Sequence, residues 1–437
     1  MNKTTRLTLL AALILLVAAA AAEAMTLTMP LSQVKPGMKG RGRSVFQGRA
    51  AEDFEVEILG IMQNVSPKRS IILARLRGRG LESTGIIGGM SGSPVYIDGK
   101  LIGAVAYGFS YSKEPIAGIT PIEEMLAVGA ALEEPAQGVA SPIALREGLG
   151  QEELSGTYLR TLAAATGGRG RDRTVAPLEL PLMFGGFSAG AFEKAGPFFA
   201  SLGFRPLRSG SGGQLLPGAA PAGPSVREGD SVGVQLVGGD LDVSAVGTVT
   251  YVDGSKVLAF GHPVYNLGRV DYAMTRADVI AVVPSLESSF KLASAGPVIG
   301  RFTEDRTAGA AGEVGVMPRL IPLNIGLRTG PAQRKDYKLK LVADKFLTPA
   351  LVNMAVSGLV TGEERSYGDI SLDFSADVFL DRDGLGVHLE DLFTGNFDAP
   401  VTSLSGLMAA VVHVLMNNEF KDVGIFRIDL EVKAVEE

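Results

Sequence analysis

The sequence predicts a mainly β protein with several domains. At 437 residues the chain is long enough for two to four domains, and 46% of its residues are hydrophobic, which is sufficient to form cores. Glycine, with 56 residues, and proline, with 23, together exceed their usual combined share of about 12%. This composition favours many turns and short strands over long helices, as in β-barrels and sandwiches.

A hairpin in the first third of the chain is the clearest local signal. Asp98-Gly99 lies between the apolar runs 95–97 and 100–108. Asp-Gly in this position predicts a tight turn, because a type I′ turn needs positive φ at both central residues. The other elements expected in this unit are strands over residues 54–58, 70–76 and 117–121 and a helix that begins at Ile122.

The hexapeptide Gly89-Met90-Ser91-Gly92-Ser93-Pro94 directly precedes this hairpin. It has the form of the nucleophile loop of a chymotrypsin-like serine peptidase, in which small residues let the backbone aim N–H groups at an oxyanion. Loop, hairpin, return strand and closing helix follow one another as in the second barrel of trypsin-like peptidases. The sequence therefore predicts a chymotrypsin-like double β-barrel with Ser91 as nucleophile. The alternative is a glycine-rich turn in an unrelated β domain.

A serine hydroxyl needs a neighbouring base, and the chain has three histidines. His413 lies in an apolar helical run, where a structural role is expected, and His388 follows a turn without a partner signature. His262 follows the apolar run 257–260 and lies between glycine and proline. This resembles the way in which chymotrypsin-like enzymes present their base, so His262 is the predicted base. The alternative is an ordinary turn histidine.

A third member of the site is left open by the sequence. Asp271, Asp278 and Asp305 all follow His262, and Asp305, 43 residues further on, has a plausible spacing for an acid on the same barrel. The three histidines are isolated and the chain has no cysteine, so we predict neither a metal site nor a cofactor.

Two stretches of the chain, about residues 31–127 and 228–318, resemble the peptidase domain of the sporulation stage IV protein B (SpoIVB) family of chymotrypsin-like serine peptidases. The first runs from Val34-Lys35-Pro36-Gly37 through Gly-Met-Ser-Gly-Ser-Pro to Gly103-Ala104-Val105. The second runs from Gly247 to Asp253 and leads to Ala259-Phe260-Gly261-His262. The resemblance implies that Ser91 is the nucleophile and His262 the general base. It also implies that the N–H groups of Gly89 and Ser91 form the oxyanion hole.

Three features depart from the family pattern. In the family the histidine half precedes the serine half, whereas here Ser91 precedes His262, so the halves look permuted. The family carries an aspartate shortly before its serine, but residues 75–83 contain only Glu82 as an acidic residue. We recognise no PDZ domain in the chain.

The expected domain organisation has five parts. The last portion alternates as strands around residues 337–343, 370–378 and 426–432, with a helix over 407–415 that Thr402 or Ser403 caps. The predicted parts are a signal peptide (1–24), a serine-bearing half (25–128), a connecting segment with a Gly/Pro-rich linker (129–225), a histidine-bearing half (226–319) and a C-terminal α+β or β-sandwich-like domain (320–437).

The N-terminus has the pattern of an export signal. Lys3 and Arg6 precede the 14-residue apolar run Leu9–Ala22, and Ala22-Glu23-Ala24 offers a cleavage site before Met25. Such a run is short for a membrane span, which needs about 20 residues. We therefore expect a mature periplasmic or extracellular protein, and the absence of cysteine favours a bacterial envelope. The alternative is an uncleaved membrane anchor.

Two functions from different classes fit these patterns. The first is an exported serine endopeptidase that acts on proteins or peptides in the cell envelope. The second is a catalytically inactive relative that binds peptides or scaffolds envelope proteins, because a fold does not determine an activity. The net charge of −6 and the lack of a long basic run argue against nucleic acid as a partner. The oligomeric state is not predicted.

Overall fold

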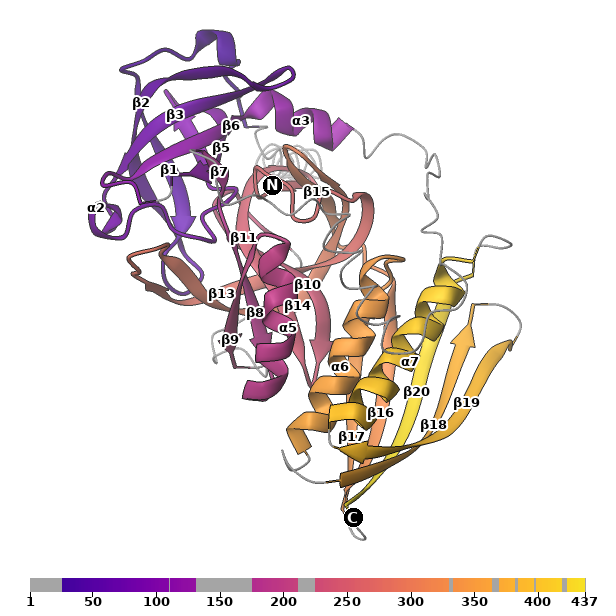
Figure 1. The fold of residues 1–437 in the computed structure, drawn as a ribbon. Coiled ribbons are helices and arrows are strands. Elements are labelled where there is room, and N and C mark those ends of the chain that lie inside the picture. Colours follow the sequence, from indigo (N-terminus) through magenta and orange to yellow (C-terminus); the bar gives the residue numbers. More distant parts are fainter. Residues whose placement is uncertain are drawn as a thin grey trace, which may run out of the picture.

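The structure is a computed structural model, and it describes residues 26–109, 111–130, 175–210, 225–329, 333–363, 369–381, 384–396, 398–418 and 423–436. Two β-barrels lie side by side, and a helix-covered sheet extends from the second barrel (Figure 1). The predicted signal peptide and most of the predicted Gly/Pro-rich linker lie outside the described residues.

The first barrel has six antiparallel strands in the order β4-β1-β2-β3-β6-β5, and a pairing between β4 and β5 closes it. Its strands are β1 (Lys39–Val45), β2 (Ala51–Ser66), β3 (Arg69–Arg77), β4 (Pro94–Ile97), β5 (Lys100–Gly108) and β6 (Ile116–Pro121). The short helices η1 (Leu31–Gln33) and α2 (Leu81–Thr84) and the helix α3 (Ile122–Ala130) belong to the same unit. The predicted Asp98-Gly99 hairpin is confirmed, with φ of 49° and 75° at its two central residues.

The second barrel is also closed and also has six antiparallel strands, in the order β10-β13-β14-β15-β12-β11 with a β10–β11 pairing. Its strands are β10 (Ser231–Gly239), β11 (Asp242–Asp253), β12 (Lys256–Ala259), β13 (Gly268–Val283), β14 (Phe290–Arg306) and β15 (Gly309–Val314). The predicted double barrel is thus confirmed.

The connecting segment is more than a linker where the structure describes it. β7 (Ala176–Pro177) adds to β5 of the first barrel, and β8 (Leu180–Gly185) adds to β11 of the second. β9 (Phe204–Ser209) runs parallel to β8, and α5 (Ala189–Ser201) connects the two. Every residue of β8 is buried, so this segment joins the two barrels through packed strands.

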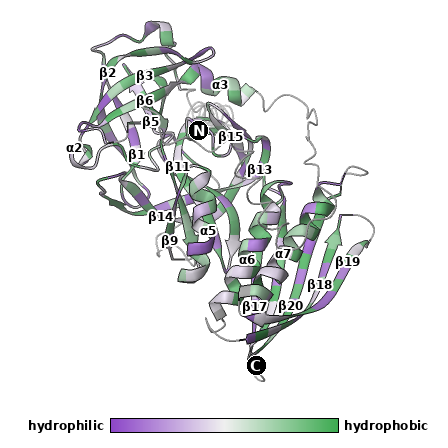
Figure 2. Ribbon diagram, in the orientation of Figure 1, coloured by the Kyte–Doolittle hydropathy of each residue, from purple (hydrophilic) through white to green (hydrophobic). Residues whose placement is uncertain are grey.

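The C-terminal portion continues the sheet of the second barrel, since β17 pairs with β10. Its elements are β16 (Leu320–Thr329), β17 (Gln333–Val342), β18 (Asp369–Leu380), β19 (Gly386–Asn396) and β20 (Ile425–Glu436), with the helices α6 (Leu347–Glu363) and α7 (Asp398–Met416). Polar and apolar residues alternate along β18 and β20, as the sequence predicts (Figure 2). One hydrophobic core extends from this sheet into the second barrel.

The helix α7 begins earlier than predicted. It starts at Asp398, so the prediction that Thr402 or Ser403 caps it is wrong. Pro400 lies in the first turn, where an N–H has no helical partner and proline is therefore tolerated. In the described part of the chain, α7 is also the one helix long and apolar enough to cross a membrane, and 56% of its 18-residue window is buried inside the protein. A core helix of this length passes the same test.

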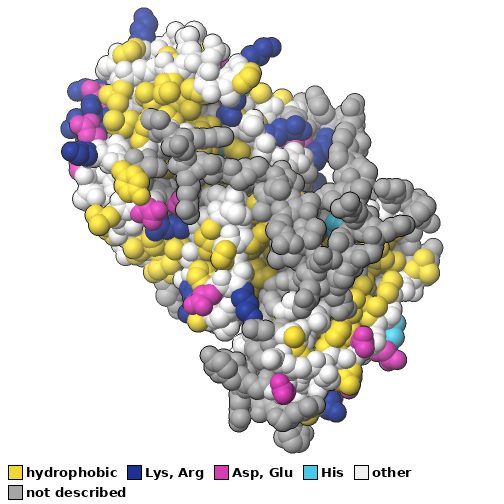
Figure 3. All heavy atoms as spheres, viewed as in Figure 1, with side chains coloured by type: hydrophobic (Ala, Val, Ile, Leu, Met, Phe, Trp, Pro, Cys, Tyr) yellow, Lys and Arg dark blue, Asp and Glu magenta, His cyan; other side chains and the backbone are white. Residues whose placement is uncertain are grey.

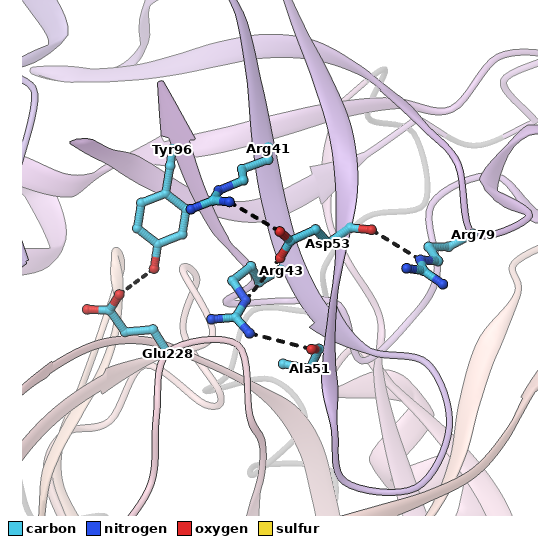
Figure 4. Close-up of polar contacts among 7 residues, drawn as sticks. All are labelled: Arg41, Arg43, Ala51, Asp53, Arg79, Tyr96 and Glu228. Carbon is cyan, nitrogen blue, oxygen red and sulfur yellow. Dashed lines mark hydrogen bonds and ion pairs between the residues drawn. The ribbon is translucent and has the colours of Figure 1, made fainter. Parts of the chain in front are cut away.

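Polar contacts reinforce the contact between the barrels (Figure 4). The Tyr96 hydroxyl at the end of β4 donates to Glu228, which precedes β10. Beside it, Asp53 accepts from Arg41 and pairs with Arg43 at 3.0 Å. In the space-filling view, acidic and basic side chains also lie next to one another at the outer edge of the first barrel (Figure 3).

Candidate active site

The nucleophile loop connects α2 to β4 and fits against the second barrel. Gly89 and Gly92 have φ of 94° and 97°, a region that favours glycine. A Cβ atom on Gly92 would lie 1.9 Å from the Thr248 carbonyl oxygen and 2.5 Å from the Phe260 N. The small residues of the loop therefore serve two purposes: they permit the sharp turn, and they allow the backbones of the two barrels to approach.

His262 reaches the loop from the end of β12. Phe260 and Gly261 both have positive φ, 71° and 69°, which for a bulky residue such as Phe260 is a rare conformation. This turn directs the imidazole across the junction, and His262 Nε2 lies 2.8 Å from Ser91 Oγ. The structure thus brings together two residues that are 171 positions apart in the sequence.

The second ring nitrogen of His262 determines its tautomer. Nδ1 lies 2.9 Å from the carbonyl oxygen of Pro263, which can only accept. Nδ1 therefore carries the proton, and Nε2 of the neutral ring is an acceptor that faces the Ser91 hydroxyl. This is the tautomer that a general base requires.

Asp305 binds the backbone of the loop that carries the base. Its carboxylate accepts the N–H groups of Val264, Tyr265 and Asn266 at 2.7 to 2.8 Å. Asp305 is fully buried, and this desolvation raises its pKa to about 6 despite the backbone hydrogen bonds. Asp305 is therefore close to the base, as its spacing suggested, and it acts on the main chain of the base's loop.

The two other aspartates lie in separate contacts. Asp271 accepts the N–H of Arg319 and pairs with Arg301 at 3.7 Å. Asp278 pairs with Arg49 of the first barrel, with 2.9 Å between Arg49 Nη2 and Asp278 Oδ2. Both are therefore engaged in ion pairs of β13.

Threonine hydroxyls hold the carbonyl groups of both loops. Thr248 and Thr250, on one face of β11, donate to the carbonyl oxygens of Gly89 at 3.0 Å and Gly92 at 2.7 Å. Thr120 of β6 donates in the opposite direction, from the first barrel to the Gly261 carbonyl at 2.5 Å. All three threonines are buried, so these bonds are shielded from water. Each loop thus accepts side-chain hydrogen bonds from the barrel that does not carry it.

A buried lysine lies beneath the nucleophile loop. Lys291 Nζ donates to Ser44 Oγ at 2.9 Å, and the Ser93 hydroxyl donates to the same oxygen at 2.9 Å. The Lys291 stem packs against Gly89, where a Cβ atom would lie 3.1 Å from Lys291 Cδ. Because Lys291 is completely buried, desolvation lowers its pKa to about 7.

The two predicted oxyanion donors are open. Among the described residues, the N–H groups of Gly89 and Ser91 donate to no protein acceptor. Their neighbours are engaged, since Met90 N–H donates to Ile87 O and Gly92 N–H to Val105 O. Two free amides on alternate residues, beside the Ser91 hydroxyl, can bind a negatively charged oxygen. Ser91 and His262 are themselves fully buried.

The remaining histidines lie elsewhere. His388 of β19 lies with its Nδ1 2.8 Å from Oδ1 of Asp377 on β18, an exposed carboxylate partner that the sequence did not indicate. His413 is buried in α7, in agreement with the predicted structural role. Within the described ranges no group of three His, Asp or Glu side chains could hold a metal ion.

Sequence reasoning missed Lys291, Thr248 and Thr250 as parts of the site. The two threonines stand at alternate positions in Gly247–Asp253, the stretch that supported the family resemblance, and this spacing places them on one face of a strand. Nothing in the sequence around Lys291 distinguishes it from a lysine on a solvent-facing strand. Its burial depends on the docking of the first barrel.

A comparison with protein families finds one match. Residues 16–126 match the family model described as SpoIVB peptidase S55, and this stretch includes the nucleophile loop. The second stretch of resemblance, around His262, lies outside the match. No curated protein and no solved structure matches the chain. Over residues 16–126 the chain is thus similar to the SpoIVB peptidases, a family of serine peptidases.

Proposed function

We propose that the chain is an exported serine endopeptidase that cleaves protein or peptide substrates in the cell envelope, with Ser91 as nucleophile and His262 as general base. One observation carries this proposal: Ser91 Oγ lies 2.8 Å from His262 Nε2. The Nδ1 contact with Pro263 O supports it, because it leaves Nε2 ready to accept the serine proton.

The geometry supports an acyl-transfer mechanism. Ser91 Oγ attacks the carbonyl carbon of the peptide bond while His262 Nε2 takes its proton. The N–H groups of Gly89 and Ser91 stabilise the oxyanion, a contribution that is usually worth about 3 kcal/mol per donor. His262 then gives the proton to the leaving amine, and a water molecule, activated by the same base, hydrolyses the acyl-enzyme.

The imidazolium that forms in each step is stabilised through the loop. Pro263 O accepts the Nδ1 proton, and the Asp305 carboxylate binds the N–H of Val264, two residues from the base. A carboxylate held on the backbone places negative charge near the imidazolium and keeps the carbonyl group aligned. Asp305 is therefore a positioning residue in this proposal.

The experiment that tests the proposal is labelling with a fluorophosphonate probe, together with hydrolysis of a protein substrate such as casein. We expect the mature protein to be labelled at Ser91, and both Ser91→Ala and His262→Ala to lose labelling and at least about 10³-fold in kcat. Circular dichroism would verify that both variants are folded. Turnover that persists in a folded Ser91→Ala variant would refute the proposal.

Export is a separate part of the proposal, and it is based on the N-terminal pattern of Lys3, Arg6 and the apolar run Leu9–Ala22. Its test is N-terminal sequencing of the protein recovered from the envelope of a bacterial host. A mature terminus near Met25 is expected. Recovery of the full-length chain in the cytoplasm would contradict export.

A catalytically inactive, peptide-binding protein is the second candidate. One observation favours it: Ser91 and His262 are both fully buried, so a substrate cannot reach them in this conformation. A folded protein that no probe labels under any condition, but that binds peptides, would support this candidate.

A further inference from the structure

A short segment of the chain forms an additional strand at the site. Ala176 and Pro177 pair antiparallel with Gly108 and Tyr107 at the end of β5. The N–H of the next residue, Leu178, donates to the carbonyl oxygen of Ala106 at 2.9 Å. Figure 1 shows β7 beside β5, at the junction of the first barrel with β11. The segment therefore adds an antiparallel strand to a strand end that lies at this junction.

The end of β5 lies between the nucleophile and the base. Val105 exchanges two hydrogen bonds with the nucleophile loop: it accepts from Gly92 N–H at 2.8 Å and donates to Ser93 O at 2.9 Å. On the other side, Ala106 Cβ lies 3.1 Å from the position that a Cβ atom on Gly261 would take. Leu178 is thus bound to Ala106, which lies against the loop of His262 and directly follows Val105, the residue bound to the loop of Ser91.

The Leu178 side chain fills an apolar pocket. It is 8% exposed and belongs to the core cluster that includes Ile87, Met90, Val105 and Ile119. Its Cδ2 lies 2.8 Å from the position of a Cβ atom on Gly108, so glycine at that position gives the side chain room.

The chain leaves this pocket beside the nucleophile loop. The Glu179 carbonyl oxygen lies 3.0 Å from the position of a Cβ atom on Gly88, and the Glu179 side chain is exposed. The segment therefore passes from the end of β5 to the start of the nucleophile loop within two residues. An extended peptide that is to meet Ser91 would follow the same course, because peptide recognition at a strand edge uses main-chain bonds for affinity and side-chain pockets for specificity.

We infer that peptide substrates bind as an antiparallel strand on the end of β5, with a leucine-sized aliphatic side chain in the pocket of Leu178 just before the cleaved bond, and that Ala176–Leu178 occupies this place in the resting enzyme. The inference rests on the proposed function. It explains why Ser91 and His262 are buried although their mutual geometry is suited to catalysis. Activation then consists of displacing the segment.

The segment acts as an inhibitor in this arrangement. Among described residues, the N–H groups of Gly89 and Ser91 donate to no acceptor, so the segment fills the side-chain pocket while the oxyanion position stays open. A substrate that also engages those two amides gains bonds that the segment does not make. This difference favours exchange of the segment for a true substrate.

Subsites for the residues before Leu178 lie on the side of the base. A cavity of about 680 Å³ lies on this side. The described residues that line it include Val175 and Pro177 of the segment, Tyr107 of β5, and Pro263, Tyr265 and Asn266 of the base's loop. A longer peptide displacing the segment has room here for side chains two or more residues before the cleaved bond. The preferred sequence should therefore resemble Val175-Ala176-Pro177-Leu178, with leucine at the pocket.

The first test compares the labelling rates of full-length variants with a fluorophosphonate probe. Leu178→Asp places a charge in the apolar pocket and should release the segment, which we expect to accelerate labelling of Ser91 at least tenfold. Leu178→Met fills the pocket equally and should label like the wild type. Leu207→Asp, at a half-buried leucine on β9, is the matched control for an aspartate in the same connecting region and should not accelerate labelling.

The outcomes separate this inference from the proposed function. A folded Leu178→Asp variant that labels no faster than the wild type, while both label at Ser91, would overturn the inference and leave the peptidase assignment standing. Equal acceleration by Leu207→Asp would also overturn it, since a general loosening would then explain the result. Absence of labelling in every folded variant would refute the peptidase proposal itself.

The second test addresses the substrate. Leu178→Asp enzyme would be assayed with chromogenic peptides Val-Ala-Pro-X-p-nitroanilide, in which X is Leu, Lys or Asp. We expect kcat/KM for Leu to exceed the values for Lys and Asp at least tenfold, because the pocket has apolar walls. A preference for Lys or Asp, or equal rates for all three, would show that the Leu178 pocket does not receive the substrate.

Discussion

The nucleophile loop and the base's loop meet at one point but are held in different ways. The nucleophile loop depends on the other barrel, since hydroxyl groups of β11 bind the carbonyl oxygens of Gly89 and Gly92 and Lys291 of β14 packs beneath it. The base's loop is held mainly within its own barrel, by the carboxylate of Asp305, also on β14. The strand β14 thus supports both loops, through the Lys291 ammonium group near its start and the Asp305 carboxylate near its end.

This difference assigns separate roles to docking and to local structure. The conformation of the base's loop can form with the second barrel alone, whereas the nucleophile loop reaches its final shape only when the barrels are in contact. Changes at the interface should therefore affect Ser91 first, and changes at Asp305 should affect His262 without separating the barrels.

The largest effect is expected from Gly92→Ala. Its Cβ atom would collide with the backbone at Thr248 O, 1.9 Å away, and at Phe260 N, so the barrels would have to move apart. We expect a loss of at least about 4 kcal/mol in the free energy of unfolding, together with loss of fluorophosphonate labelling. Urea denaturation would measure the free energy of unfolding, and gel fluorescence would measure the labelling.

Gly99→Ala is the matched control for that variant. Gly99 also has positive φ, 75°, but a Cβ atom there would have nothing within 4 Å. The alanine should then lower the free energy of unfolding only by the strain of the left-handed conformation, about 1 to 2 kcal/mol, and labelling should persist. If both variants lost labelling equally, backbone strain rather than docking would explain the effect, and the comparison of the two loops would fail.

Asp305→Asn tests the base's loop. The amide keeps the shape of the side chain but replaces one acceptor oxygen with a donor, which opposes the N–H groups of Val264, Tyr265 or Asn266. We expect kcat to fall about 10²-fold with little change in KM, because the base is displaced while the substrate edge on β5 is intact. Steady-state kinetics with a peptide substrate would measure the two parameters separately.

The pH dependence of that variant distinguishes positioning from simple damage. In the wild type, the pKa of Asp305 is raised to about 6 by burial, so its carboxylate is protonated as the pH falls through 6 and the loop loses acceptors. Part of the wild-type loss of kcat on the acid side should therefore be missing in Asp305→Asn. An acid limb of the same shape in both proteins would show that Asp305 has no part in positioning the base.

Local signals in the sequence were sufficient to predict the double barrel and the Asp98-Gly99 hairpin, and to select Ser91 and His262, whose side chains lie 2.8 Å apart in the structure. They were sufficient because each depends on neighbouring residues: turn chemistry, alternation, and a histidine between glycine and proline. The role of Lys291 could not be predicted in this way. Alternation identifies the strand that contains Lys291, but it does not show which face of that strand the other barrel will cover. The pairing of β17 with β10 could not be predicted either, because it joins residues about 100 positions apart.

Lys291→Met should change how stability depends on pH. The pKa of Lys291 is lowered to about 7 in the folded protein, whereas the unfolded chain keeps the ordinary value of 10.5. Between these values the unfolded state binds the additional proton, so the free energy of unfolding should rise with pH, by up to about 4 kcal/mol from pH 7 to pH 10. Lys291→Met should remove this rise, as measured by urea denaturation at the two pH values.

The matched control for Lys291→Met is Lys39→Met, at an exposed lysine of β1. It should retain the wild-type dependence on pH, because its side chain is in water in both states. A wild-type slope that survives in Lys291→Met would mean that the ammonium beneath the nucleophile loop is not desolvated in solution. A contact other than the Lys291 ammonium would then have to support that loop.

The smallest effect is expected from His388→Ala. His388 lies beside two carboxylates, Asp377 at 2.8 Å and Glu390 at 3.8 Å, and the hydrogen bond to Asp377 raises its pKa. The interaction stabilises the fold below the ordinary histidine pKa of about 6.5 and is lost as the pH rises through the raised value. Because these side chains are largely exposed, solvent screens the pair, and we expect an unchanged labelling rate and no measurable shift in the thermal midpoint at pH 7. A loss of labelling in this variant would mean that the C-terminal sheet acts on the site, and that the two loops are not supported by β11 and β14 alone.

A histidine beside a carboxylate, such as His388, is common on a protein surface. What sets His262 apart is a buried hydroxyl at 2.8 Å and a main-chain acceptor that fixes its tautomer.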